Sequence, residues 1–236
     1  QVADDDPRLH LERVTYPGRS GPVSGYLARP ANASGALPGV VVIHENRGLN
    51  AHIEDVARRA ALAGYLALAP DGLSVAGGAP VDQEQARDLF AATDRASIDA
   101  DVIAAVPYLA GREDCSGRVG TVGFCYGGGI ALRCAAEHAQ VGAAVCFYGS
   151  ALDDDQVARV RAPLAMHYAG DDPRINAGIP GFRESLDRHG VAYSLHMYPG
   201  TGHGFHNDAS AARYNPAAAR LAWQRTIALF EAALVI

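Results

Sequence analysis

Short apolar segments alternate with longer segments of helical composition along most of the chain. Several of the apolar segments are continuous runs bounded by glycine or proline, which is typical of strands buried on both faces. We expect strands at residues 39–44, 65–69, 119–122, 141–147, 163–168 and 192–198, and helices at 52–62, 81–109, 130–136, 179–189 and 216–234. The alternation predicts an α/β fold with a mostly parallel central sheet and helices on both faces.

The N-terminal region departs from this alternation. Two strand-like segments, residues 13–16 and 23–28, flank a Pro/Gly-rich turn, so we expect an antiparallel hairpin there. Residues 1–12 are polar and are predicted to be a loosely held lead-in, and residues 13–236 are predicted to form a single domain. We expect residues 81–109 to form one or two helices, with a break near Thr93 and Asp94, and the acidic run 153–155 to lie in a loop.

Polar side chains with catalytic chemistry follow four of the predicted strands. They are Glu45, Cys125, Asp172 and His203. Because the carboxyl ends of parallel strands meet at one edge of a sheet, we expect these side chains to form a single site there. This convergence is the main indication of an active site that comes from the residues themselves.

Cys125 lies in the pattern Gly-x-Cys-x-Gly between a predicted strand and a predicted helix. This is a nucleophile elbow in which sulfur replaces the serine oxygen. A sharp strand-to-helix turn is sterically crowded, and glycines at 123 and 127 remove the Cβ atoms that would clash. The start of the following helix would favour the thiolate, and the Tyr126 amide, together with that of Asn46, would form an oxyanion hole. The alternative is a buried structural cysteine at an ordinary turn.

A thiol nucleophile needs a base, and the base needs a carboxylate that orients it. We take His203 as the base because it follows the last predicted strand between glycines, with His206 as the competitor. The pair His203-x-x-His206 also has a metal-like spacing, but no second pair of ligands supports a metal site. The residues alone do not separate Asp171 from Asp172 as the acid.

Composition excludes several other classes of protein. The chain has 236 residues, 49% of them hydrophobic and 19% charged, with a net charge of −6. This balance indicates a globular protein without a basic face for nucleic acid, and no apolar run reaches the length of a membrane span. We therefore expect neither a nucleic-acid nor a membrane partner, and a monomer or small homo-oligomer.

Neither the four cysteines nor the first residue determines the cellular compartment of the protein. The cysteines are Cys115, Cys125, Cys134 and Cys146, and none form a Cys-x-x-Cys pair. We expect Cys134 and Cys146 to be core residues, whereas Cys115 lies in a polar turn and could be reduced or paired. The chain begins with Gln and not Met, which weakly favours an exported, periplasmic protein over a cytoplasmic one.

At these residues the chain resembles the dienelactone hydrolase family (carboxymethylenebutenolidases) of α/β-hydrolases. The resemblance runs from about Val14 to the last predicted helix, and its most specific motifs are HENRG at 44–48, GFCYGG at 123–128 and HGF at 203–205. It implies the α/β-hydrolase fold and a cofactor-free hydrolase of small esters or lactones.

The resemblance also implies a role for each residue of the site. It makes Cys125 the nucleophile, His203 the base and Asp172 the triad acid, because Gly170 to Asn176 match the family pattern Gly-x-Asp-x-Arg-Ile-Asn. Glu45 matches a family glutamate that contacts the resting thiol and helps to generate the thiolate.

The substrate contacts do not carry over. The better-known dienelactone hydrolases that this chain resembles hold a substrate carboxylate with two arginines, and the matching positions here are Asn207 and Gln83. Substrate contacts are predicted instead at Asn207 itself and at three residues of the N-terminal half, namely Arg47, Arg87 and Phe90. Neutral esters are therefore an alternative substrate class, and a ligand-binding module with a vestigial site is an alternative function.

Overall fold

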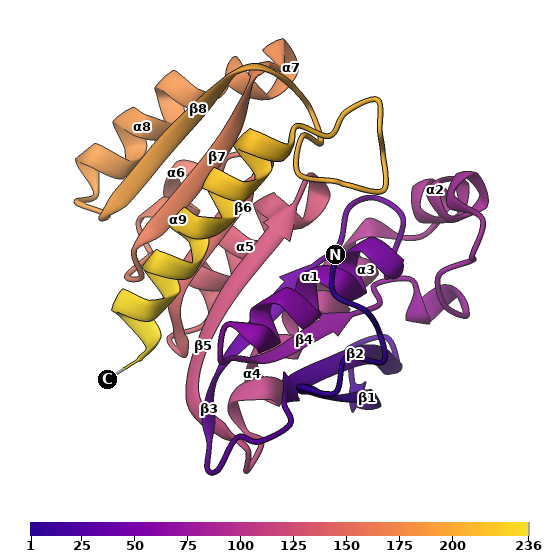
Figure 1. Ribbon diagram of the computed structural model, residues 1–236. Helices are drawn as coiled ribbons and strands as arrows, with labels where there is room; N and C mark the ends of the chain where they lie inside the picture. Colours follow the sequence, from indigo (N-terminus) through magenta and orange to yellow (C-terminus); the bar gives the residue numbers. More distant parts are fainter. Residues whose placement is uncertain (236) are drawn as a thin grey trace. The chain divides into compact units, whose positions relative to one another are not determined.

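The structure, a computed structural model, describes residues 1–235 and divides into two compact units, Gln1–Val119 and Gly120–Ile236. In the described part the strands hydrogen-bond in the order β1-β2-β4-β3-β5-β6-β7-β8, with β5 passing from the first unit into the second (Figure 1). The strands are β1 (Leu9–Pro17), β2 (Pro22–Pro30), β3 (Leu37–Ile43), β4 (Leu66–Pro70), β5 (Cys115–Phe124), β6 (Val141–Phe147), β7 (Leu164–Asp171) and β8 (Tyr193–Gly202).

Helices connect most of the strands. They are α1 (Ala51–Leu62), the 3₁₀ turn η1 (Ser74–Ala76), α2 (Gln83–Ala92), α3 (Arg95–Ile103), α4 (Ala105–Ala110), α5 (Tyr126–Glu137), α6 (Asp154–Val157), α7 (Pro173–Asn176), α8 (Ile179–Arg188) and α9 (Pro216–Leu234). Many begin at a side chain that accepts a hydrogen bond from the first turn, as Asn50 does for α1 and Asp82 for α2.

The first unit contains the antiparallel part of the sheet. β1 pairs with β2 and β2 pairs with β4, both antiparallel, whereas β3 and β4 are parallel. The predicted hairpin is confirmed, and its first strand begins at Leu9, inside the predicted lead-in. Ahead of it, the Val2 amide donates to Asp55 at 2.6 Å and Arg58 donates to the Val2 carbonyl at 2.8 Å, so the start of the chain is tied to α1.

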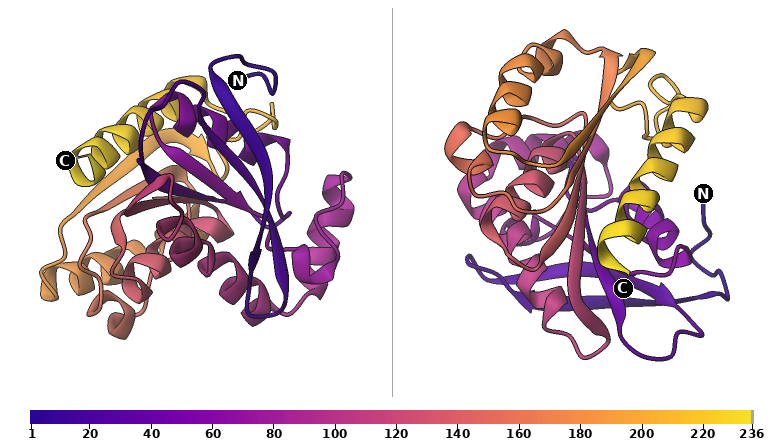
Figure 2. Two further views of the ribbon diagram at one scale, coloured as in Figure 1. Left: turned by 90° about the horizontal axis from the view of Figure 1, so that it is seen from below. Right: turned by 90° about the vertical axis from the view of Figure 1, so that its left-hand side faces the viewer.

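The second unit has parallel strands covered on both faces. β6 pairs with β7 and β7 with β8, all parallel. In the right-hand view of Figure 2, α9 lies on one face of these strands and α5 on the other. Glycines permit the close approach of α9, since a Cβ on Gly120 would lie 2.7 Å from the Phe230 ring. The predicted sheet, mostly parallel with an antiparallel N-terminal hairpin, is confirmed. That residues 13–236 form one domain stays a prediction.

Two local predictions differ from the structure. The acidic run is not only a loop, because Asp153 caps the short helix α6 in a capping box with Gln156. The segment predicted as helix over 81–109 contains three helices, although its break at Thr93 and Asp94 is where the sequence predicts it. Asp94 makes this break because its side chain accepts the Ser97 amide at 2.9 Å and starts α3.

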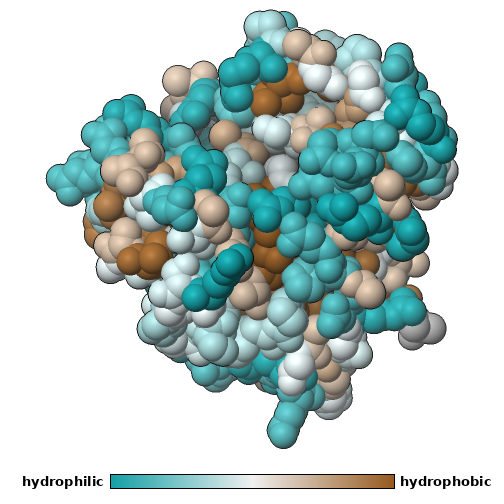
Figure 3. Space-filling model, turned by 180° about the vertical axis from the view of Figure 1, so that it is seen from behind, coloured by the Kyte–Doolittle hydropathy of each residue, from teal (hydrophilic) through white to brown (hydrophobic). Residues whose placement is uncertain are grey.

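The surface carries few large apolar groups. On the face in Figure 3, hydrophilic residues predominate and hydrophobic residues form small separate groups. Large hydrophobic residues exposed in the described part are Val75, Val81, Met197, Leu221 and Val235. None of the helices within residues 1–235 is both long and apolar enough to cross a membrane.

Candidate active site

Cys125 occupies a strained turn between β5 and α5. Its φ is 54° and its ψ is −113°, a region that residues with a side chain rarely adopt. Gly123 is required here, since a Cβ at that position would lie 1.8 Å from the Gly127 carbonyl oxygen. Backbone hydrogen bonds hold the turn: the Cys125 amide donates to the Phe147 carbonyl at 3.0 Å, and the Gly128 amide donates to the Cys125 carbonyl at 3.1 Å.

Cys125 differs from the other three cysteines in its exposure. Its side chain is half-buried, whereas Cys115, Cys134 and Cys146 are buried, and none of the four forms a disulfide. Burial raises the pKa of the Cys146 thiol to about 12 and also raises the pKa of Cys134. Both cysteines lie in the core, as predicted, and their raised pKa keeps the thiols protonated. Cys115 is buried at the start of β5 rather than lying in an open turn.

Asp172 and His203 form a close pair. Asp172 Oδ2 lies 2.5 Å from His203 Nδ1, the Asp172 side chain is 6% exposed and that of His203 is 25% exposed. Asp172 also caps α7, accepting the Ile175 amide on its other oxygen at 3.4 Å. Asp171, by contrast, is the exposed last residue of β7. Of the two adjacent carboxylates, the structure therefore pairs Asp172 with the imidazole.

His203 follows β8 at the start of a loop that leads to α9. Its ring lies 5.0 Å, centroid to centroid, from that of Tyr148, the residue directly after β6. Because the Phe147 carbonyl accepts the Cys125 amide, Tyr148 connects the elbow to the imidazole through one peptide and one ring contact.

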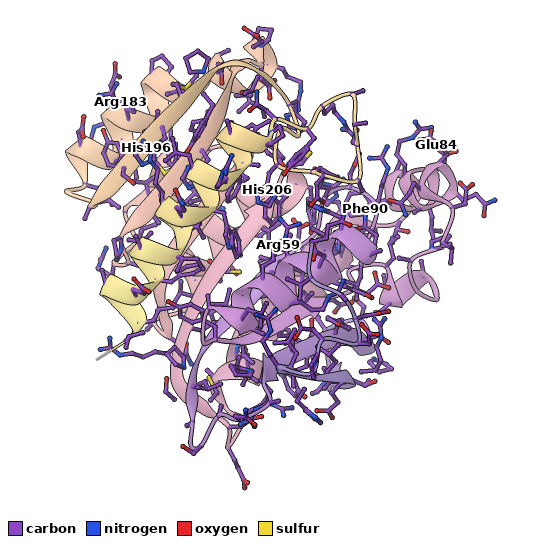
Figure 4. The ribbon with its side chains drawn as sticks, viewed as in Figure 1. Arg59, Glu84, Phe90, Arg183, His196 and His206 are labelled. Atoms are coloured by element: carbon purple, nitrogen blue, oxygen red, sulfur yellow. The ribbon has the colours of Figure 1, made fainter. Side chains whose placement is uncertain are left out.

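The competing histidine, His206, has a different environment. It is fully buried, with its ring 4.9 Å from that of Phe124, 4.9 Å from that of Phe147 and 5.9 Å from that of Trp223 on α9 (Figure 4). Within residues 1–235 no three His, Cys, Asp or Glu side chains are grouped so that they could hold a metal ion. His206 therefore belongs to the aromatic core of the second unit.

The predicted residues of the HENRG motif lie in the first unit. Glu45 is 4% exposed. The preceding residue, His44, is fully buried: its Nδ1 lies 2.5 Å from the Glu45 carbonyl and its Nε2 accepts the Gly72 amide at 3.0 Å. This arrangement puts the proton on Nδ1, and burial lowers the pKa of His44. The ring therefore stays neutral and holds the Glu45–Asn46 peptide.

The predicted substrate contacts are distributed over both units. Arg47 donates to the Gln83 carbonyl at 3.2 Å. Arg87 is an exposed residue of α2 that pairs with its neighbour Glu84 at 2.5 Å. Phe90, also on α2 and labelled with Glu84 in Figure 4, is 2% exposed.

Asn207 lies in the second unit. It is buried, and its side chain accepts the Ala209 amide at 3.1 Å.

Two residues that contact His203 or its neighbour Gly204 were not predicted. One is Tyr148, which the sequence indicates only weakly, as an aromatic residue that follows a predicted strand and precedes Gly149. The other is Arg213, which lies against Gly204, the residue after His203. A Cβ on Gly204 would lie 3.4 Å from Nη1 of Arg213. Its Nε donates to Ser210 at 3.0 Å, and no carboxylate of the described residues forms an ion pair with it. No sequence pattern marks Arg213, because the contact arises only when the loop folds back.

A mostly parallel sheet with a cysteine elbow after β5 and an Asp–His pair after β7 and β8 has the architecture of an α/β-hydrolase. The sequence model of the dienelactone hydrolase family matches residues 23–234. The chain belongs to the dienelactone hydrolase family and is a hydrolase.

Similar proteins agree with this placement. The "Probable 2-oxo-3-(5-oxofuran-2-ylidene)propanoate lactonase" of Bradyrhizobium is 36% identical over 219 residues, covering 86% of each chain. The solved structure named "m3DLH" is 29% identical with a TM-score of 0.86, covering 96% of this chain and 99% of its own. A dienelactone hydrolase of Anabaena variabilis, 22% identical with a TM-score of 0.75 over 96% of this chain and 99% of its own, shares the fold. The predicted family and α/β-hydrolase fold are confirmed.

Proposed function

We propose that the chain hydrolyses small esters or lactones through a thioester on Cys125, with His203 as the base and Asp172 as the acid of the triad. The observation that supports this most strongly is the 2.5 Å contact between Asp172 and His203 in the unit that holds the strained cysteine turn. A buried carboxylate on Nδ1 leaves Nε2 to accept a proton, which a general base requires.

In the first half of the reaction, His203 takes the Sγ proton of Cys125. The thiolate forms a bond to the ester carbonyl carbon, and the negative oxygen is stabilised by backbone amides. The carbon–oxygen bond of the ester then breaks. The leaving alkoxide takes the proton from His203, and a thioester on Cys125 remains. With a lactone as the substrate, the alkoxide stays attached to the acyl group.

In the second half, His203 deprotonates a water molecule that attacks the thioester. The carbon–sulfur bond breaks, the carboxylic acid leaves and the thiol regains its proton. The Tyr126 amide, at the start of α5, and the Asn46 amide are the proposed oxyanion donors. For Glu45 the family resemblance supports a role beside the thiol.

Two substrate classes are candidates, and they differ in whether the substrate carries a carboxylate. Asn207 and Gln83 replace the two arginines of the family, which favours neutral esters or lactones. Arg213 favours a substrate with a carboxylate, because its guanidinium lies against Gly204 without a carboxylate partner among the described residues. The Bradyrhizobium relative is named as a lactonase, and we extend lactones to this chain on that similarity.

Replacing Cys125 tests the mechanism. We expect Cys125→Ala to abolish hydrolysis of p-nitrophenyl acetate and of dienelactone. Cys134→Ala, on α5 and fully buried, is the matched control and should keep turnover near that of the unchanged enzyme. Mass spectrometry after mixing with a slow ester should detect an acyl group on the peptide that contains Cys125. Unchanged turnover in Cys125→Ala would exclude the mechanism, and a vestigial binding module would show no turnover in any variant.

A further inference from the structure

Tyr148 has a backbone conformation that its side chain does not favour. Its φ is 40°, and Cys125 is the other residue besides glycine in the described part with a positive φ. Bulky residues rarely adopt this region, and such outliers persist where the surrounding contacts impose them. The position is therefore held by its neighbours, and they also determine where the aromatic ring points.

The backbone around Tyr148 is held from three sides. The peptide between Phe147 and Tyr148 accepts the Cys125 amide at 3.0 Å through its carbonyl, and its own N–H donates to the His167 carbonyl of β7 at 2.8 Å. The next residue, Gly149, lies so close to α5 that a Cβ there would be 2.5 Å from the Gly129 nitrogen. The elbow and β7 thus fix the Tyr148 backbone between them.

The Tyr148 ring extends from this anchor to His203. It is 0% exposed, and the ring centroids of Tyr148 and His203 are 5.0 Å apart with an angle of 60° between their planes. Phe205 packs edge-on against the other part of the ring at 5.4 Å. Tyr148 is therefore a rigid support for the imidazole and not a side chain that can move aside.

We propose that Tyr148 is a positioning residue that sets the plane of the His203 imidazole during catalysis. The proposal rests on the proposed function, because it gives the imidazole the role of base. The contact from Asp172 holds one ring atom, Nδ1, and by itself allows the ring to turn about that contact. Tyr148 lies beside the ring and blocks this rotation, so that Nε2 keeps one direction. Because the same peptide carries the elbow hydrogen bond, the base and the nucleophile share one anchor.

Three variants test the role of the ring. Tyr148→Phe keeps the ring, and Tyr148→Leu keeps bulk without a flat ring. Tyr148→Asn removes the ring but suits a positive φ, because asparagine tolerates it better than most residues. Tyr168→Leu is the matched control: Tyr168 is a tyrosine of β7 with 1% exposure, and none of its described ring contacts is with His203.

The readouts are kcat, KM, melting temperature and the rate of Cys125 alkylation by iodoacetamide. We expect Tyr148→Phe to keep kcat within about threefold, because the support remains. Tyr148→Leu and Tyr148→Asn should lose about 10–100-fold in kcat with little change in KM, as small displacements of a base do. Alkylation should slow in parallel. Tyr168→Leu should lose melting temperature without a comparable loss of kcat.

Two outcomes would overturn the proposal. One is a kcat for Tyr148→Asn within about threefold of that for Tyr168→Leu, even if Tyr148→Leu is too unstable to measure. The other is an equal loss of kcat in Tyr148→Phe and Tyr148→Leu, which would assign the effect to the hydroxyl. The failure of this proposal differs from failure of the proposed function, because in the first case Cys125→Ala is still inactive, and in the second it retains turnover.

Discussion

Replacing Gly123 with alanine tests how tightly the cysteine turn is built. The added Cβ would lie 1.8 Å from the carbonyl oxygen and 2.2 Å from the carbonyl carbon of Gly127, both backbone atoms. Carbon atoms in contact are about 3.5 Å apart, so the start of α5 would have to retreat by about 1.5 Å. Extra methyl groups in cores usually cost about 1–3 kcal/mol, and we expect about 3 kcal/mol here because backbone must move.

The same displacement should reduce catalysis as well as stability. A shift of about 1 Å in a reacting group can cost about 100-fold in rate, so Gly123→Ala should lose about that factor in kcat for p-nitrophenyl acetate. The melting temperature should fall by roughly 6–12 °C for a chain of this length. Gly181→Ala on α8 is the control, since its Cβ would meet nothing within 4 Å, and it should stabilise slightly. A Gly123→Ala enzyme with unchanged kcat and melting temperature would refute the steric reasoning.

Three further changes have distinct expected results. Asp172→Asn should lower kcat about 100-fold or more, because it removes the charge beside His203. It should keep stability, since asparagine also caps helices. A kcat within about threefold of the original would contradict the triad. His167→Gln should make the free energy of unfolding depend less on pH in acid. Burial and nearby positive charge hold the pKa of His167 well below its usual value, so below about pH 6.5 only the unfolded chain takes up this proton. In the original protein, this uptake lowers the free energy of unfolding by about 1.4 kcal/mol per pH unit. Urea unfolding between about pH 5 and 7 measures this, and equal slopes in both proteins would contradict it. Arg213→Gln should raise KM about tenfold for an ester that bears a carboxylate and leave a neutral ester unchanged; no difference between the two substrates would show that Arg213 does not bind substrate.

The sequence predicts those parts of the site that depend on local geometry. Gly-x-Cys-x-Gly predicts the turn at Cys125, because the clash that Gly123 avoids involves an atom only four residues away. The capping box at Asp153 is equally local, and its Asp-x-x-Gln pattern would have predicted α6.

Other features depend on contacts between distant segments. Asp171 and Asp172 are adjacent carboxylates at one strand end, and only the path of the chain after β7 pairs Asp172 with an imidazole 31 residues later. The contact between Arg213 and Gly204 likewise needs the fold of the loop that follows β8. The spacing of hydrophobic residues does not predict this contact, because Gly204 and Arg213 both lie outside the helices and strands.

Within residues 1–235, the two residues other than glycine with a positive φ are Cys125 and Tyr148, and both belong to the proposed site. Cys125 directly follows β5 and Tyr148 directly follows β6, where the chain leaves the ladder of hydrogen bonds and must turn sharply. One peptide joins them, since the Phe147 carbonyl accepts the Cys125 amide and the adjoining N–H bonds to β7. Because strain at each residue is held by contacts with the other's neighbours, relief at one should alter the other. The double variant Gly123→Ala/Tyr148→Leu should therefore lose less free energy of unfolding than the sum of the two single variants. Additive losses would show that the two turns are independent.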